Sequence, residues 1–157
     1  MKKATQPVPE GFHTLTPHLT VKGGEQAIDF YRRAFGAREI RRHAFNGAIA
    51  HAQLEVGSSM LMLNDEFPGQ GCFAPPEGGG GTTLHLYVAD ADAAFRRAVE
   101  AGAEVVMPLA DMFWGDRYGI VRDPFGHLWS IASNREVLTP EEVAERAAKA
   151  FAGGCEA

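Results

Sequence analysis

The feature that most restricts the fold of this chain is an internal repeat that divides it into two halves. Residues 16–21 (TPHLTV) resemble residues 83–88 (TLHLYV), and the threonine, the histidine and the final valine recur at a spacing of 67 residues. Each segment precedes a run with helical spacing of apolar residues, which ends at a glycine, Gly36 or Gly102. A repeat of this length predicts two copies of one structural module.

Each half contains one predicted helix and four predicted strands. Helical periodicity predicts helices over 25–35 and 92–100. The side chains expected to be buried on these helices are Ile28, Tyr31 and Phe35 in the first and Ala94, Phe95, Ala98 and Val99 in the second. The predicted strands cover 16–21, 38–45, 48–56 and 60–64, and then 83–88, 104–110, 117–122 and 127–133. The fold class is therefore α+β, with two tandem β-α-β-β-β modules.

Turn-forming residues and a helix-capping signal set the boundaries of these modules. The segments that we expect are a disordered N-terminus over 1–12, a first module over 13–66, a flexible Pro/Gly linker over 67–81, a second module over 82–135, and a C-terminal helix and tail over 136–157. Thr139 and Glu142 form a capping box that starts the last helix, over 140–151. Its apolar stripe is expected to pack on its own chain or on a dimer partner.

Charge and cysteine content exclude several classes of protein. The formal net charge is −5, which argues against a nucleic-acid-binding protein. No apolar run reaches the roughly 20 residues that a membrane-spanning helix needs, and no apolar core follows the first lysines, as a signal peptide would require. Cys72 and Cys155 lie far apart, so we expect no disulfide framework and a cytoplasmic location.

Six motifs in order carry a resemblance to a known family. These motifs are TPHLTV, AIDFYRRAFGA, HAQLEVG, MLMLND, FWGDRYG and DPFGHLW. Over residues 13–135 the chain resembles the vicinal oxygen chelate superfamily of glyoxalases, bleomycin-resistance proteins and extradiol dioxygenases, and within it the PhnB-like branch. The resemblance implies that the two modules form a cupped eight-stranded mixed sheet around a cavity, and that the protein is a homodimer.

The resemblance also implies where a metal would bind. Metal-dependent members place one ligand on the first strand and one on the last strand of each module. The matching positions in this sequence are Thr16, Met62, Thr83 and Ser130. None of these side chains is an imidazole, a carboxylate or a thiolate, which are the ligands that zinc, nickel or iron prefer. We therefore expect no metal and no other cofactor.

Three histidines lie close to these positions and complicate that interpretation. His18 and His85 each follow the matching threonine by two residues, so each shares its side of the strand. His51 on a third strand is a further candidate. These histidines are expected to line the cavity as hydrogen-bonding groups; a displaced divalent metal site is the alternative. The remaining histidines, expected as ordinary surface or loop residues, are His13, His43 and His127.

Large side chains suggest further contacts with a ligand. In 111–119, the rings of Trp114 and Tyr118 offer stacking faces. Arg117 offers paired N–H donors for an anion, with Asp116 expected to hold Arg117 in place. The alternative is a structural corner in which Trp114 fills a gap and Arg117 pairs with an acid. Met60 and Met62 suit an adaptable apolar wall. Trp129 and Ile131, which flank Ser130, are expected in the core.

Three functional hypotheses follow. The first is a metal-free protein that binds a small anionic or aromatic molecule, as resistance proteins do. The ligand-binding set is His18, His51, Met62, His85, Trp114, Arg117 and Ser130. The second is a lyase or dioxygenase with a metal on His18, His51 and His85. The third is a metal-free enzyme in which one of these histidines is the general base and Arg117 stabilises an anion. Whether the protein is an enzyme stays open.

Overall fold

The computed structural model describes residues 6–152. They form two compact units, one from the first half of the chain up to Gly80 and one that begins at Gly81; the short turn Pro124–Gly126 belongs to the first unit. Residues 6–12 contain a turn closed by a 3.1 Å hydrogen bond from the amide of Phe12 to the carbonyl of Pro9. The first five residues of the predicted disordered N-terminus, and Cys155, lie outside the described part.

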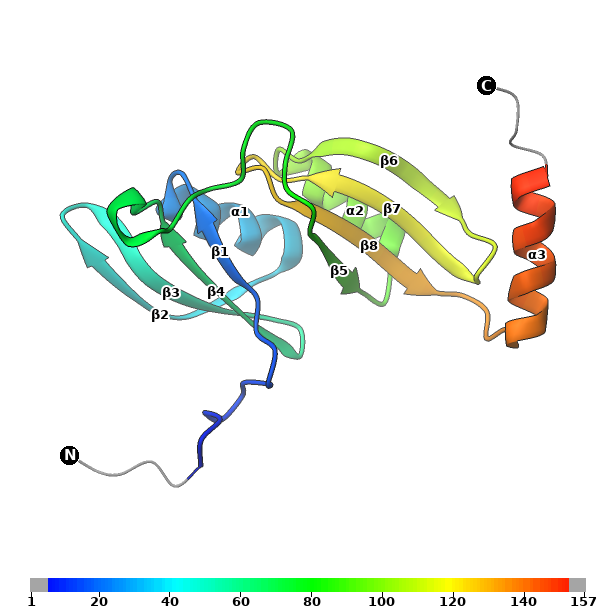
Figure 1. Ribbon diagram of the computed structural model, residues 1–157, viewed down its shortest axis with the longest axis horizontal. Helices are drawn as coiled ribbons and strands as arrows, with labels where there is room; N and C mark the ends of the chain where they lie inside the picture. The colour runs from blue at the N-terminus through cyan, green and yellow to red at the C-terminus, as the bar shows by residue number, and fades with distance from the viewer. Residues whose placement is uncertain (1–5, 153–157) are drawn as a thin grey trace. The chain divides into compact units, whose positions relative to one another are not determined.

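The first module contains one helix and four strands in the predicted order (Figure 1). Its elements are β1 (His18–Val21), α1 (Gly24–Phe35), β2 (Arg38–Phe45), β3 (Ala48–Val56) and β4 (Ser59–Asp65). The sheet order is β1-β4-β3-β2. Strand β1 runs parallel to β4, and the other neighbours are antiparallel.

The second module repeats this topology. Its elements are β5 (Thr83–Tyr87), α2 (Ala91–Glu100), β6 (Glu104–Asp111), β7 (Asp116–Arg122) and β8 (Leu128–Asn134). The sheet order is β5-β8-β7-β6, with β5 parallel to β8. Two four-stranded mixed sheets, eight strands in total, confirm the predicted α+β class and the duplicated β-α-β-β-β unit.

The predicted linker over 67–81 contains a short element that periodicity does not show. Pro68–Gln70 form a 3-10 helix, η1, with proline at its first position and Gly71 in the left-handed conformation after it (φ 76°). Phe67 and Cys72 form an isolated antiparallel bridge across this turn. Local proline and glycine geometry therefore orders part of the segment.

Each helix covers one face of its own sheet. Helix α1 buries Ile28, Tyr31 and Phe35, as predicted. Helix α2 buries Ala94 and Ala98 but leaves Val99 38% exposed, so the prediction for Val99 is wrong. Successive helical residues are about 100° apart, which turns Val99 away from the sheet when Ala98 faces it.

The C-terminal helix α3 (Pro140–Ala152) starts as predicted. The hydroxyl of Thr139 accepts a hydrogen bond from the amide of Glu142 (3.2 Å), and the Glu142 carboxylate accepts one from the amide of Thr139 (2.8 Å). The ring of Phe151 lies 5.7 Å from that of Phe113 but is 70% exposed. Among residues 6–152, no helix is long and apolar enough to cross a membrane.

Candidate functional site

The sheet of each module has one face covered by its helix and one face free of helices. In the second module, Gly119 faces α2, because a Cβ atom added there would lie 2.7 Å from the ring of Phe95. Ile131 pairs with Gly119 and shares its side of the sheet. Tyr118 and Ser130 are their neighbours along the strands, so they point to the helix-free face.

His85 and Ser130 meet on this helix-free face. They are paired across the parallel strands β5 and β8, and the Nδ1 atom of His85 lies 2.7 Å from the Oγ atom of Ser130. The imidazole is also 4.4 Å from the ring of Tyr87 and 5.9 Å from that of Tyr118, measured between centroids. The structure thus brings two of the predicted ligand-binding residues together with Tyr118, whose ring the sequence predicted as a stacking face, and with Tyr87, which the sequence did not single out. Tyr87 follows His85 by two residues on a predicted strand, so the sequence could have placed both side chains on the same face.

A buried carboxylate holds the aromatic side chains of this face. Asp116 is only 3% exposed and accepts three hydrogen bonds. The donors are the Tyr87 hydroxyl (2.9 Å), the Trp114 indole (3.1 Å) and the Asn134 amide (3.0 Å). The hydrogen bond to this carboxylate raises the pKa of Tyr87 above its usual value, so the phenol stays protonated. The ring of Trp114 also lies 5.4 Å from that of Tyr118.

Arg117 points to the opposite face of the sheet from Tyr118. Its Nη2 atom lies 2.8 Å from the carboxylate of Asp92 in α2, and its Nη1 atom 3.4 Å from that of Asp111. The expectation that Asp116 holds Arg117 is therefore wrong, since adjacent residues of a strand point to opposite faces. The ion pairs match the alternative in which Arg117 pairs with an acid.

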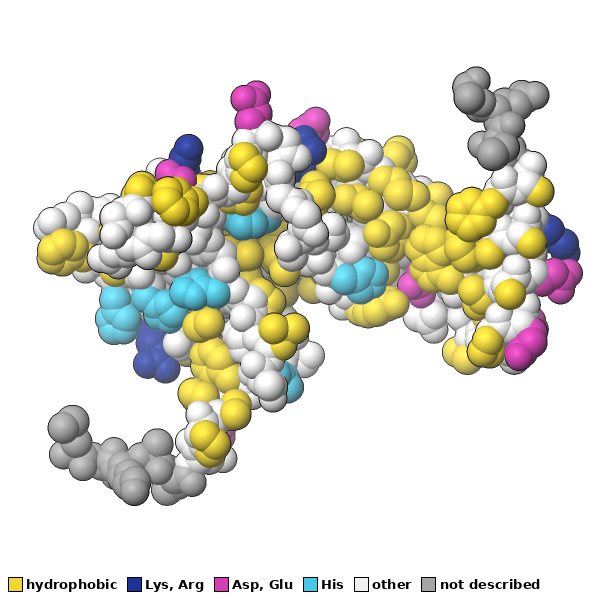
Figure 2. All heavy atoms as spheres, viewed as in Figure 1, with side chains coloured by type: hydrophobic (Ala, Val, Ile, Leu, Met, Phe, Trp, Pro, Cys, Tyr) yellow, Lys and Arg dark blue, Asp and Glu magenta, His cyan; other side chains and the backbone are white. Residues whose placement is uncertain are grey.

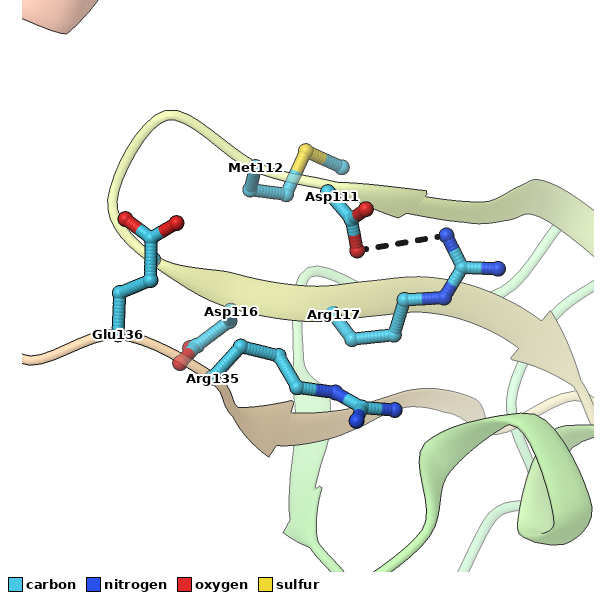
Figure 3. A pocket seen from close by; sticks show the side chains of 7 residues that line it. Asp111, Met112, Asp116, Arg117, Arg135 and Glu136 are labelled. Atoms are coloured by element: carbon cyan, nitrogen blue, oxygen red, sulfur yellow. Dashed lines mark hydrogen bonds and ion pairs between the residues drawn. The ribbon is translucent and has the colours of Figure 1, made fainter.

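Arg117 lines a pocket of about 390 Å³ where β6 ends and β7 begins (Figure 3). The other lining residues are Asp111, Met112, Gly115, Asp116, Arg135 and Glu136. Figure 3 shows Arg117 joined to Asp111 at this site. Both arginines also contact Asp92. Their charges are thus largely balanced by acids of the same module.

The first module has a more polar helix-free face. His18 pairs with Met62 across β1 and β4, and the rings of His18 and His51 lie edge to face at 5.6 Å. Burial lowers the pKa of His51 below its usual value, and the nearby His18, His43 and Arg41 lower it further. His18 and His51 thus lie together on the first module, and His85 belongs to the second.

The four positions matched to metal ligands have donor groups that do not fit a divalent metal. Thr16 lies before β1, and its hydroxyl donates to the carbonyl of His13 (3.1 Å). Ser130 is hydrogen-bonded to His85, and Met62 offers only a thioether. Within residues 6–152, no group of three or more His, Cys, Asp or Glu side chains is arranged to hold a metal. Hydroxyl and thioether groups are poor ligands for zinc or nickel.

The two residues beside Ser130 are part of the core, as predicted. Ile131 is fully buried, and Trp129 is buried with its indole nitrogen donating to the carboxylate of Asp123 (2.9 Å). Met60 and Met62 are half-buried on strand β4. His13 and His43 are exposed, and His127 is half-buried in the turn before β8.

Comparison with known proteins assigns the chain to a family. The model of the Glyoxalase/Bleomycin resistance protein/Dioxygenase superfamily matches residues 11–131. The uncharacterized protein Rv0887c of Mycobacterium tuberculosis is 44% identical over 134 residues, which cover 82% of this chain and 79% of that protein.

Two solved structures share the fold of this chain. The gene product At5g48480 of Arabidopsis thaliana is 31% identical, with a TM-score of 0.63 over 77% of this chain and 98% of that one. A PhnB protein from Bacillus cereus, described as a putative 3-demethylubiquinone-9 3-methyltransferase, shares the fold at 19% identity, with a TM-score of 0.60 over 77% and 99% of the two chains. The chain therefore belongs to the glyoxalase/bleomycin resistance protein/dioxygenase superfamily.

Proposed function

We propose that this protein binds a small planar or aromatic molecule, without a metal, on the helix-free face of the second module. The observation that carries the proposal is the aromatic cluster of His85, Tyr87, Trp114 and Tyr118, in which the imidazole is hydrogen-bonded to Ser130. The resemblance to metal-dependent members predicts a ligand at Ser130. Here that position holds the hydrogen-bond partner of an imidazole instead.

The aromatic rings of this cluster are exposed or half-buried, and hydrogen bonds to Asp116 fix the orientation of two of them. Tyr87 is 62% exposed, although its hydroxyl is held by the buried Asp116. The same carboxylate holds the indole of Trp114. Aromatic rings favour offset or edge-to-face contact with other rings, and rings that are already held lose little freedom on binding. A planar molecule is therefore the ligand that this surface suits.

Binding of 1-naphthoate followed by ¹H–¹⁵N NMR tests the proposal. The chain has two tryptophans, and their indole N–H groups report on opposite faces of one sheet. We expect 1-naphthoate to shift the Trp114 signal in a saturable manner and to leave the Trp129 signal in place, since Trp129 is buried and donates to Asp123. Equal shifts of both signals, or none, would contradict the proposal.

A matched pair of variants sharpens this test. Tyr118→Ala removes one ring of the cluster, and we expect about 3- to 10-fold weaker binding of 1-naphthoate. Phe73→Ala removes an exposed ring (64% exposed) from the loop after β4, and binding should stay the same. Treatment with a chelator should also leave affinity unchanged. A requirement for added zinc or nickel would overturn the metal-free part of the proposal.

The predicted homodimer and the predicted cytoplasmic location stay predictions. Phe151 of α3 is exposed, so it is available for contact with a second copy of the chain. Light scattering of the full chain, compared with the variant Phe151→Ser, measures the mass directly. A monomeric mass for the unaltered protein would show that no dimer forms.

A further inference from the structure

We propose that the helix-free face of the first module binds a small oxyanion, a carboxylate or phosphate group, through Arg41 and the adjacent histidines. The three histidines are His18, His43 and His51; with Arg41 they are called the His/Arg row below. This face belongs to a different sheet from the aromatic cluster, so the inference does not depend on the proposed function.

Arg41 is the cation of β2 that has no acid beside it. Its Nε atom donates to the Oε1 atom of Gln53 (2.7 Å). Within residues 6–152, its terminal nitrogens have no hydrogen-bond partner, and no carboxylate lies within ion-pair distance. By contrast, Arg38 is paired with Glu55. Arg42, on the same strand, is paired with Glu39 and Glu25. A guanidinium with both terminal nitrogens available can bind a carboxylate or phosphate through two parallel hydrogen bonds.

Gln53 links Arg41 to His51 and fixes the orientation of both. Because Arg41 donates to its oxygen, the amide nitrogen of Gln53 must face the Nε2 atom of His51, 3.3 Å away. This assignment makes Nε2 of His51 the acceptor and places the ring proton on Nδ1. The neutral imidazole thus keeps one N–H donor. The burial that lowers the pKa of His51 favours this neutral form.

Three strands contribute imidazoles to the row. His43 pairs with His51 across β2 and β3, and the ring of His18 from β1 lies edge-on to His51 at 5.6 Å. Figure 2 shows histidine side chains gathered beside a basic side chain on the first module. Strand β4 contributes uncharged side chains to this face, Met62 among them.

The charges around the row favour an anion. The nearest carboxylate on this face along β3 is Glu55, which is already paired with Arg38. The row is therefore a locally positive site in a chain with a net charge of −5. Arg41 supplies the permanent charge, and the imidazole rings supply N–H donors. An oxyanion that reaches the row gains charge-assisted hydrogen bonds without displacing an internal ion pair.

The proposal is tested by titration of the whole protein with inorganic phosphate, followed by ¹H–¹⁵N NMR. The pH is about 7.5, because unperturbed histidines are neutral there. Sodium acetate and sodium chloride at the same ionic strength serve as comparisons. We expect phosphate or acetate to shift the Nε–H signal of Arg41 and the ring signals of His51 in a saturable manner. The anion that saturates first identifies the ligand as a phosphate or a carboxylate. Shifts no larger than those with chloride would overturn the proposal.

Two variants distinguish a specific anion-binding site from a general effect of the protein's charge on anion binding. Arg41→Gln should weaken the apparent affinity for the saturating anion roughly tenfold or more. Arg42→Gln removes the same charge from the same strand at a residue that is paired with Glu39 and Glu25 on the helix side of the sheet, and the affinity should change less than about twofold. Equal losses in both variants would overturn the proposal. Circular dichroism checks that both fold, and the 1-naphthoate signal at Trp114 reports independently on the second module.

Discussion

The imidazole of His85 and the hydroxyl of Ser130 lie 2.7 Å apart on neighbouring parallel strands. Ser130 is 2% exposed, so it is shielded from solvent while it orients an exposed ring. This contact places a polar pair at the centre of an aromatic face. At the position where the family resemblance predicts a metal ligand, the serine side chain is therefore engaged by an imidazole.

Ser130→Ala should release the ring of His85. Loss of one hydrogen bond costs about 0.5–1.5 kcal/mol of the free energy of unfolding, measured by urea denaturation. The His85 ring signals should broaden or shift, while those of His51 stay in place. Unchanged His85 signals would show that the serine does not orient the ring.

Asp116→Asn should destabilise the second module strongly. The amide oxygen can accept from the three donors only in part, and the amide nitrogen would face at least one N–H or O–H group. We expect a loss of about 1–3 kcal/mol in the free energy of unfolding, because a buried polar group is left unpaired. Asp111→Asn, at a carboxylate whose side chain is 80% exposed, is the control and should have no measurable effect.

The same Asp116→Asn variant should change the titration of a tyrosine. The hydrogen bond to Asp116 raises the pKa of Tyr87, so removal of the carboxylate should lower that pKa toward its ordinary value. The chain has three tyrosines, so ultraviolet titration of the variant is carried out in a Tyr31→Phe, Tyr118→Phe background, which leaves Tyr87 alone. A pKa that rises or stays the same would contradict the assigned hydrogen bond.

Arg117→Gln distinguishes a role of Arg117 in ligand binding from a structural role in which it only pairs with acids. Arg117 pairs with Asp92 on the helix side of the sheet, away from the aromatic cluster. We therefore expect the affinity for 1-naphthoate to stay within about twofold, as surface ion pairs contribute little. A tenfold loss of affinity for 1-naphthoate would instead support a site in which Arg117 and Trp114 bind the same ligand.

Gly119→Ala should show how closely α2 approaches its sheet. An added methyl group would lie 2.7 Å from the Phe95 ring and 3.0 Å from the backbone nitrogen of Leu109. Overpacking of this kind costs about 1–3 kcal/mol. Gly80→Ala meets no atom within 4 Å and is the matched control. Equal stability of the two variants, by thermal unfolding, would contradict the close approach.

The sequence by itself determined the elements of this protein. Helical and strand periodicities are local, so they predicted both modules, the buried face of α1 and the capping box at Thr139. The spacing of Trp129 and Ile131 also placed them in the core, because strand residues alternate between faces.

Only the tertiary structure decided which side chains meet. The partners of Asp116 come from β5, β8 and the turn before β7, and Arg117 turned out to pair with α2. The register of His85 with Ser130 likewise joins residues far apart in the sequence. Strand register depends on the packing of whole sheet faces, and a shift of one residue would reverse every side chain. Local patterns therefore predict which residues form a strand, whereas the contacts that build a site depend on how the strands are aligned.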